Sequence, residues 1–212
     1  MNIYAFSGLG ADKRVFEHLQ LNHKLVCIDW IKPKKNGSLE TYTTRLVMNI
    51  NSNEPFVLLG VSFGGLVAVE ASKMLNPRAT ILVSSAATKY ELSWFQRLIG
   101  KTGLLKILPS FVFRPPNFVA NIMFGAKNKS LLHKILRDTD LAFAKWASQQ
   151  LATWNNEIEP SNLYKISGSA DKLIPPSKTE NTILVKDGGH FMIVDKADEV
   201  SELINGIIKN LV

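Results

Sequence analysis

The sequence predicts an α/β protein with a mostly parallel sheet of about six strands, helices on both faces of the sheet and an inserted helical cap. Short apolar runs alternate with helical stretches up to residue 87, and this alternation is typical of a parallel sheet. No strand pattern occurs from 88 to 150, where the apolar residues follow helical spacing. Strand patterns resume after residue 150. We therefore expect residues 1–87 and 151–212 to form the core and residues 88–150 to form the cap.

In the first part of the core, strands and helices are expected to alternate. The expected strands cover residues 2–6, 25–29, 56–61 and 79–85. The expected helices cover residues 13–20, 38–49 and 66–75. Asp12 is suited to cap the first of these helices, and Asn76-Pro77 is suited to end the third.

The cap is expected to consist of short amphipathic helices. Residues 118–124 and 131–137 have helical spacing, and a Pro-rich stretch over 111–117 precedes them. A helix over 141–154 should return the chain to the sheet. The remaining core strands are expected at 163–167 and 182–185, and a closing helix at 197–210.

Composition excludes several classes of protein. The 212 residues are 46% hydrophobic, which suits one good core and leaves little room for two domains. The single cysteine, Cys27, excludes an internal disulfide, and its apolar strand predicts a role in core packing. No apolar stretch reaches the ~20 residues of a membrane span, and no leader pattern precedes the first strand. We therefore expect no membrane span and a cytoplasmic location.

The net charge of +7 is concentrated in the cap. Residues 88–150 carry 10 basic and 3 acidic side chains. Such an excess can indicate nucleic acid, anionic lipid or an acidic substrate as a partner. Here the basic residues stand singly among apolar ones and form no nucleic-acid motif. We interpret them as a solvated outer face and expect no nucleic-acid partner.

The turn after the third expected strand has a sequence that suits a nucleophile. Gly60, Ser62 and Gly64 form a Gly-x-Ser-x-Gly motif between an apolar strand and a helix. At such a corner the serine hydroxyl projects over the carboxyl edge of the sheet, and small flanking residues let the two backbones approach closely. The strand–turn–helix setting indicates a nucleophile elbow rather than an ordinary tight turn.

The chain resembles the α/β-hydrolase fold family over nearly all of its length except the cap. The resemblance rests on this motif and on two loops that follow later in the chain. The segments Gly168-Ser169-Ala170-Asp171 with Pro175, and Gly189-His190-Phe191, are similar to the acid and histidine loops of that family. The family order is serine, then acid, then histidine, each after a strand. The resemblance therefore implies a catalytic triad of Ser62, Asp171 and His190. In this chemistry histidine takes the serine proton and the acid orients the imidazole.

The same resemblance implies an oxyanion hole made of two backbone N–H groups. One is the amide of Phe63, the residue after the nucleophile. The other is the amide of Leu9, in the glycine-rich loop after the first strand. Many members of the family have His-Gly at the place where this chain has Ser7-Gly8, so one family signature is absent.

Several other residues could contribute to the site but suit it less well. Asp29 ends the second strand on the correct edge of the sheet and remains a minor alternative acid. The others are interpreted as surface, turn or structural residues: His18, His23, His133, Asp187, Ser84 and Ser85. No cluster of His, Cys or carboxylate residues has the spacing of a metal site, and Ser7-Gly8-Leu9-Gly10 lacks the third glycine of a dinucleotide fingerprint.

The expected function is that of a serine hydrolase without metal or cofactor that cleaves an ester, thioester or similar acyl bond of a small molecule. Two alternatives stay open. One is a ligand-binding or sensor protein on the same fold with little turnover. The other is an acyltransferase or C–C bond hydrolase that uses the same triad. The sequence leaves open the substrate and the oligomeric state.

Overall fold

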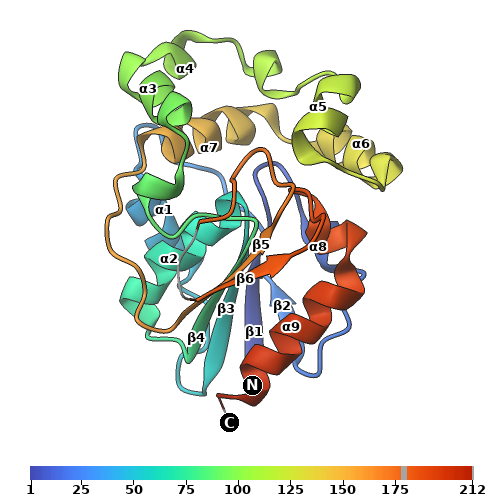
Figure 1. The fold of residues 1–212 in the computed structure, drawn as a ribbon. Coiled ribbons are helices and arrows are strands. Elements are labelled where there is room, and N and C mark those ends of the chain that lie inside the picture. Colours follow the sequence, from blue (N-terminus) through green and yellow to red (C-terminus); the bar gives the residue numbers. More distant parts are fainter. Residues whose placement is uncertain (178–180, 212) are drawn as a thin grey trace.

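The computed structural model describes residues 1–177 and 181–211, in which six strands form one sheet (Figure 1). The strand order across the sheet is β2-β1-β3-β4-β5-β6, and every neighbouring pair is parallel. The strands are β1 (Asn2–Phe6), β2 (Lys24–Cys27), β3 (Phe56–Val61), β4 (Ala79–Val83), β5 (Leu163–Gly168) and β6 (Thr182–Val185). The prediction of an α/β fold is confirmed, and the sheet is parallel throughout rather than mostly parallel.

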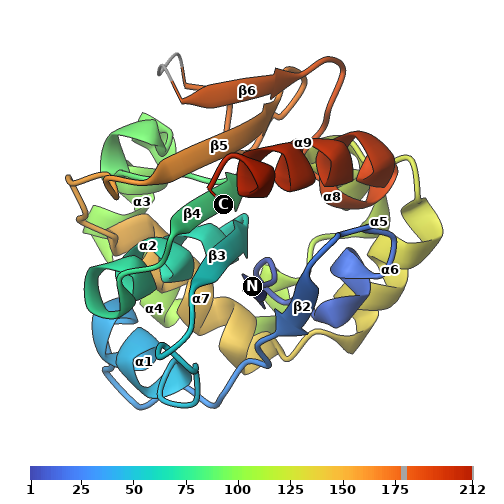
Figure 2. The same cartoon turned by 90° about the horizontal axis from the view of Figure 1, so that it is seen from below.

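Helices cover both faces of the sheet, as Figure 2 shows from below. Helices α1 (Leu39–Leu46) and α2 (Phe63–Leu75) pack on one face. The 3₁₀ helix η1 (Lys13–Phe16), the short helix α8 (Met192–Asp195) and helix α9 (Ala197–Lys209) pack on the other. Strands β3 and β4 are buried along their whole length, because they lie between these two layers.

The helices between residues 88 and 154 lie together beyond one end of the sheet (Figure 1). They are η2 (Lys89–Glu91), α3 (Trp94–Thr102), α4 (Leu104–Ile107), η3 (Ser110–Phe113), α5 (Asn117–Phe124), α6 (Lys129–Asp138) and α7 (Leu141–Thr153). As predicted, this segment holds no strand. Helix α7 packs under α3, α4 and η3 and so connects them to the core.

The first predicted helix is shorter than expected. Residues 13–20 were expected to be helical, but η1 ends at Phe16, after Val15 and Phe16 have been buried. The following backbone bonds to α9 instead: the amide of Gln20 donates to Ser201 Oγ at 2.9 Å, and the amide of Asn22 donates to Asn205 Oδ1 at 2.9 Å. This tertiary contact replaces the further helical turn that the local sequence allowed. The predicted N-cap, Asp12, does accept from the amide of Arg14 at 3.0 Å.

Other boundaries differ by one to three residues, as helix and strand ends often do. Strand β4 ends at Val83 rather than at Ser85, because Ser84 adopts a positive φ of 48° that leaves the extended conformation. Cys27 packs against the core as predicted but is only partly buried, since β2 is the edge strand. Burial nevertheless raises the pKa of the Cys27 thiol. No helix in the described ranges is long and apolar enough to cross a membrane.

Candidate active site

Ser62 occupies a sharp corner between β3 and α2. Its φ of 52° and ψ of −122° are strained for a residue with a side chain. The glycine at Gly64 makes this corner possible, because a Cβ there would lie 2.2 Å from the carbonyl oxygen of Phe6. Ser85, two residues beyond the end of β4, holds the corner: its Oγ donates to the carbonyl of Ser62 at 2.6 Å. The strand–turn–helix geometry inferred from the Gly-x-Ser-x-Gly motif is therefore present.

His190 lies beside Ser62 although 128 residues separate the two in the chain. Nε2 of His190 is 2.8 Å from Oγ of Ser62. Nδ1 of the same ring lies 2.9 Å and 3.1 Å from the two carboxylate oxygens of Asp171. Because β3, β5 and β6 are parallel, the loops that leave them meet at one edge of the sheet. The three side chains named from the sequence thus form one continuous chain of contacts.

The carboxylate of Asp171 is buried and fixed by its own loop. Its Oδ1 accepts hydrogen bonds from the amides of Leu173 at 2.9 Å and Ile174 at 3.0 Å. Only 5% of the Asp171 surface is exposed. A carboxylate with these partners has one orientation, which directs its oxygens at Nδ1 of His190.

The histidine loop also contacts α5, which the sequence did not predict. The ring of Phe124 lies 5.6 Å from the ring of His190, centroid to centroid. The amide of Phe191 donates to the carbonyl of Phe124 at 3.1 Å. The end of α5 therefore supports the loop that carries His190. No residue pattern singled out Phe124, because it is one of many apolar side chains in the segment.

The two expected oxyanion donors belong to residues close to Ser62. Phe63 is the first residue of α2, so the helix itself provides no carbonyl partner for its amide. Leu9 follows Gly8, where an added Cβ would lie 3.5 Å from Cβ of Ser62. Gly8, Leu9, Ser62 and His190 all line one cavity. This arrangement is compatible with the expected donors, whose role remains a prediction.

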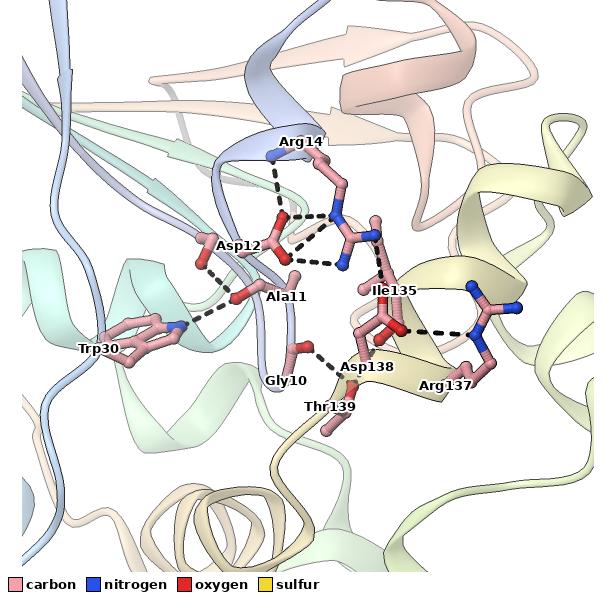
Figure 3. A network of polar contacts seen from close by, with 10 residues as sticks. Gly10, Ala11, Asp12, Arg14, Trp30, Ile135, Arg137, Asp138 and Thr139 are labelled. Atoms are coloured by element: carbon pink, nitrogen blue, oxygen red, sulfur yellow. Dashed lines mark hydrogen bonds and ion pairs between the residues drawn. The ribbon is translucent and has the colours of Figure 1, made fainter.

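The loop after β1, which carries Leu9, is held from two directions (Figure 3). Thr139 Oγ1, just beyond α6, donates to the carbonyl of Gly10 at 2.8 Å. Trp30 Nε1 donates to the carbonyl of Ala11 at 3.1 Å. Ser7 donates its hydroxyl to the same carbonyl at 2.8 Å. Neither contact was predicted, because Trp30 and Thr139 carry no sequence motif.

An ion-pair network lies beside this loop (Figure 3). Arg14 contacts Asp12 with its Nη2 at 2.7 Å and Asp138 with its Nη1 at 2.8 Å. The hydrogen bonds from Arg14 lower the pKa of both carboxyls, and the bond to Asp12 raises the pKa of Arg14. The guanidinium thus connects the residues after β1 to the end of α6.

A cavity of about 470 Å³ opens onto Ser62 and His190. Its walls come from the loops of the sheet and from the helices of residues 88–154. Most of the lining is apolar, and Gln96, Thr139 and Ser148 add polar groups. The apolar lining from the helical segment includes Ile99, Leu105, Val112, Phe113, Met123, Phe124, Leu132, Ile135, Leu136 and Leu151. The reactive groups therefore face a mostly apolar pocket.

The alternative residues are exposed or have structural contacts. Asp29 is exposed, and the carboxylate beside His190 belongs to Asp171 instead. Asp187 is an exposed turn residue with a φ of 55°.

The other histidines contact other groups or face solvent. His133 Nε2 lies 2.8 Å from Asn121 Oδ1, between α6 and α5. His18 is exposed. His23 contacts the amino terminus of the chain. In the described residues, no group of three or more His, Cys, Asp or Glu side chains could hold a metal ion.

The sheet topology and the serine corner define an α/β-hydrolase type of fold, and the comparison with family models agrees. A model described as "Alpha/beta hydrolase family" matches residues 7–203. The chain belongs to this family. A comparison with curated proteins finds no match.

Several solved structures share the fold. A thermophilic esterase from Thermogutta terrifontis is 14% identical, with a TM-score of 0.73 over 100% of this chain and 90% of that one. A meta-cleavage product hydrolase from Pseudomonas fluorescens is 15% identical, with a TM-score of 0.70 over 100% and 92%. An enol-lactonase from Burkholderia xenovorans is 16% identical, with a TM-score of 0.71 over 98% and 91%. At these identities the likeness extends to the fold alone.

Proposed function

We propose that the protein is a serine hydrolase that cleaves an ester, thioester or similar acyl bond of a small molecule through an acyl-enzyme. The observation that carries the proposal is the chain of contacts from Ser62 Oγ through His190 to Asp171. A serine hydroxyl is a weak nucleophile and needs a base within hydrogen-bond reach. Nε2 of His190, at 2.8 Å, is within that reach.

In the first half of the reaction, Ser62 Oγ attacks the acyl carbon while its proton passes to Nε2 of His190. Asp171 stabilises the resulting imidazolium and holds the ring orientation. The amides of Phe63 and Leu9 donate to the oxyanion of the tetrahedral intermediate. As the intermediate collapses, the bond to the leaving group breaks. The leaving group takes the proton from His190, and the acyl group remains on Ser62.

In the second half, water replaces the leaving group. His190 removes a proton from a water molecule whose oxygen attacks the acyl carbon, and the oxyanion is again held by the two amides. The bond between Ser62 Oγ and the acyl carbon then breaks, and Ser62 regains its proton from His190. The products are a carboxylic acid and the free enzyme. Side chains, backbone amides and water are sufficient for every step.

Residues 88–150 serve as a cap over this site in the same proposal. Their apolar side chains form much of the wall of the 470 Å³ cavity above Ser62. An acyl group bound there contacts an apolar surface while its carbonyl lies near the reactive groups. The meta-cleavage product hydrolase and the enol-lactonase share the fold, so a C–C bond and a lactone belong in the substrate panel beside simple esters.

A fluorophosphonate probe tests the nucleophile. We expect one adduct by intact mass and its position at Ser62 by peptide mapping, with labelling abolished in Ser62→Ala. Ser84→Ala is the matched control, because Ser84 also has a buried hydroxyl and a positive φ beyond a strand end. An adduct at Ser84 or Ser85 would overturn the assignment.

Turnover of short p-nitrophenyl esters separates the enzyme from the ligand-binding alternative. A hydrolase releases many equivalents of p-nitrophenol per chain, and Ser62→Ala releases none above the background. A single stoichiometric release followed by a stable acyl adduct would favour the sensor. A rate that rises with an added alcohol acceptor, with transfer to that acceptor, would favour an acyltransferase.

A further inference from the structure

The helices farthest from the sheet leave an unusual number of large apolar side chains exposed to solvent. In α3, Trp94 is 70% exposed, in α4 Ile107 is 79% exposed, and in η3 Phe111 is 70% exposed. We call the full set the outer apolar face. It consists of Trp94, Phe95, Leu98, Leu104, Ile107, Phe111, Phe118 and Ile122. Single exposed apolar residues are ordinary, but such a gathering along consecutive elements marks an interaction surface.

The cavity does not account for these side chains. The same elements line it with other residues, such as Ile99 from α3, Leu105 from α4 and Met123 from α5. Helix α5 shows both sides clearly: Phe118 and Ile122, one turn apart, are exposed, while Met123 and Phe124 line the cavity. These helices are therefore apolar toward the cavity and also apolar toward solvent, which leaves a second apolar surface for a further contact.

Charge identifies the chemistry of that partner. From Trp94 to Phe124 the sequence has four basic side chains and no Asp or Glu. Lys101, Lys106 and Arg114 are exposed, and Arg97 is partly exposed. Apolar side chains interspersed with cations, without any carboxylate, are typical of segments that lie in the interface of an anionic bilayer.

We propose that the outer apolar face docks on an anionic phospholipid bilayer surface. The apolar side chains enter the boundary between headgroups and acyl chains, and the lysine and arginine side chains contact lipid phosphates. A second copy of the chain fits less well, because a symmetric contact would bring two faces of the same positive charge together. A nucleic acid would leave the apolar side chains without a partner.

The position of the face in the molecule suits a bilayer. Figure 1 shows α3, α4 and α5 along the side of the protein opposite the lower end of the sheet, so neither the sheet nor α9 stands between them and a flat surface. Docking there also brings the helices that line the cavity to the lipid. The proposal is independent of catalysis, since no residue of the face belongs to the Ser62–His190–Asp171 contacts.

Vesicle sedimentation of the full chain tests the docking. The vesicles are phosphatidylcholine alone, or phosphatidylcholine with roughly a third phosphatidylglycerol. We expect the protein to pellet with the anionic vesicles, to remain largely in the supernatant with the neutral ones, and to be released by about 0.5 M salt. Ser62→Ala should bind like the unaltered protein, which keeps this test separate from the test of the proposed function.

Three double variants assign the binding to the face. Ile107→Ser with Phe111→Ser removes apolar contact, and Lys101→Gln with Lys106→Gln removes charge. We expect each to weaken the partition coefficient on the order of tenfold. Met48→Ser with Ile158→Ser is the matched control, because these side chains are 76% and 75% exposed and lie outside the face. The control should bind normally, and thermal melting checks that all variants are folded.

The proposal is overturned by any of three results. The first is that the protein fails to pellet with anionic vesicles at low salt. The second is that the control variant loses as much binding as the face variants. Alternatively, sedimentation equilibrium shows a concentration-dependent dimer that Ile107→Ser with Phe111→Ser abolishes, in which case the face contacts a second copy instead of lipid.

Discussion

At the scale of single residues, the hydrogen bonds around His190 decide which group can act as its partner. Asp171 is held by two amides of its own loop and reaches Nδ1 from within a buried site. Asp29, at the end of β2, is exposed to solvent. A buried carboxylate in contact with imidazole stabilises the charge that develops on the ring, whereas an exposed one at a distance is screened by water.

We expect Asp171→Asn to fold normally and to lose on the order of 10³ to 10⁴ in kcat. The asparagine oxygen can still accept from the amides of Leu173 and Ile174, so the loop keeps its bonds. Its NH₂ group, however, would favour the wrong imidazole tautomer. Steady-state hydrolysis of a p-nitrophenyl ester measures the effect. Asp29→Asn is the control and should change kcat by less than about twofold. The reverse pattern would show that the acid has been misassigned.

At the scale of elements, the end of α6 and the loop after β1 are joined by Thr139. Its hydroxyl contacts two carbonyls, that of Gly10 at 2.8 Å and that of Ile135 at 2.9 Å. The Gly10 contact fixes the loop that presents the amide of Leu9. Thr139 is therefore a positioning residue in the proposed mechanism.

Thr139→Val should lower kcat about tenfold and change KM little, because a displaced oxyanion donor affects the transition state more than the bound substrate. Thr139→Ser keeps the hydroxyl and should restore most of the activity. Thr153→Val is a matched control, since Thr153 makes the same kind of bond at the end of α7, to the carbonyl of Gln149 at 2.8 Å, without a contact to the loop. A parallel loss of kcat in both valine variants would contradict this role.

A second link between elements is the buried contact of Lys165 with Glu91. Lys165 lies in β5 and is only 1% exposed, and its ammonium contacts the carboxylate of Glu91 and the hydroxyl of Ser177. Glu91 also accepts from the amides of Ala87 and Thr88. The pair joins the start of the helical segment to the sheet and to the loop that follows Asp171.

Lys165→Met should lower the free energy of unfolding by about 3–5 kcal/mol, because it leaves the Glu91 carboxylate buried without its cation. Urea unfolding at neutral pH measures the loss. Lys89→Met is the comparison: Lys89 pairs with Glu157, whose side chain is 52% exposed, so its removal should cost less than about 1 kcal/mol. Equal losses in the two variants would show that the Lys165 contact is not the stronger link.

At the scale of the whole molecule, the proposed function predicts that the cavity between the sheet and the helical segment limits the length of the acyl group. Its volume of about 470 Å³ and its apolar lining suit an acyl group of limited length. Each methylene that is buried contributes about 0.8 kcal/mol, so two added carbons should raise kcat/KM roughly tenfold while they still fit. Once the cavity is full, further carbons stay in solvent and add nothing.

A series of p-nitrophenyl esters from acetate to palmitate should therefore show kcat/KM rising over short chains, reaching a maximum at short to medium length and then falling. Ile99→Ala, which enlarges the cavity beneath α3, should move the maximum to longer chains. Met48→Ala, outside the cavity, should leave the profile unchanged. A flat profile, or one that rises steadily to palmitate, would show that the helical segment does not bound the pocket.

The sequence by itself determined the local elements and their order. Apolar runs such as Phe56–Val61 predicted buried strands, and the glycines around Ser62 predicted the corner between β3 and α2. These features depend on neighbouring residues: the spacing of apolar side chains and the room for a sharp turn are properties of a few adjacent positions. The family resemblance then indicated Ser62, Asp171 and His190, whose side chains the structure brings into contact.

Only the tertiary structure decided what depends on groups that are distant in the chain. It shortened η1 through bonds to α9, brought Trp30 and Thr139 to the loop of Leu9, and paired Lys165 with Glu91. It also decided which apolar residues of the helical segment line the cavity and which remain outside. Spacing along a helix shows that two faces are apolar, but the neighbour of each face is chosen by packing between elements, and local sequence contains no signal for that choice.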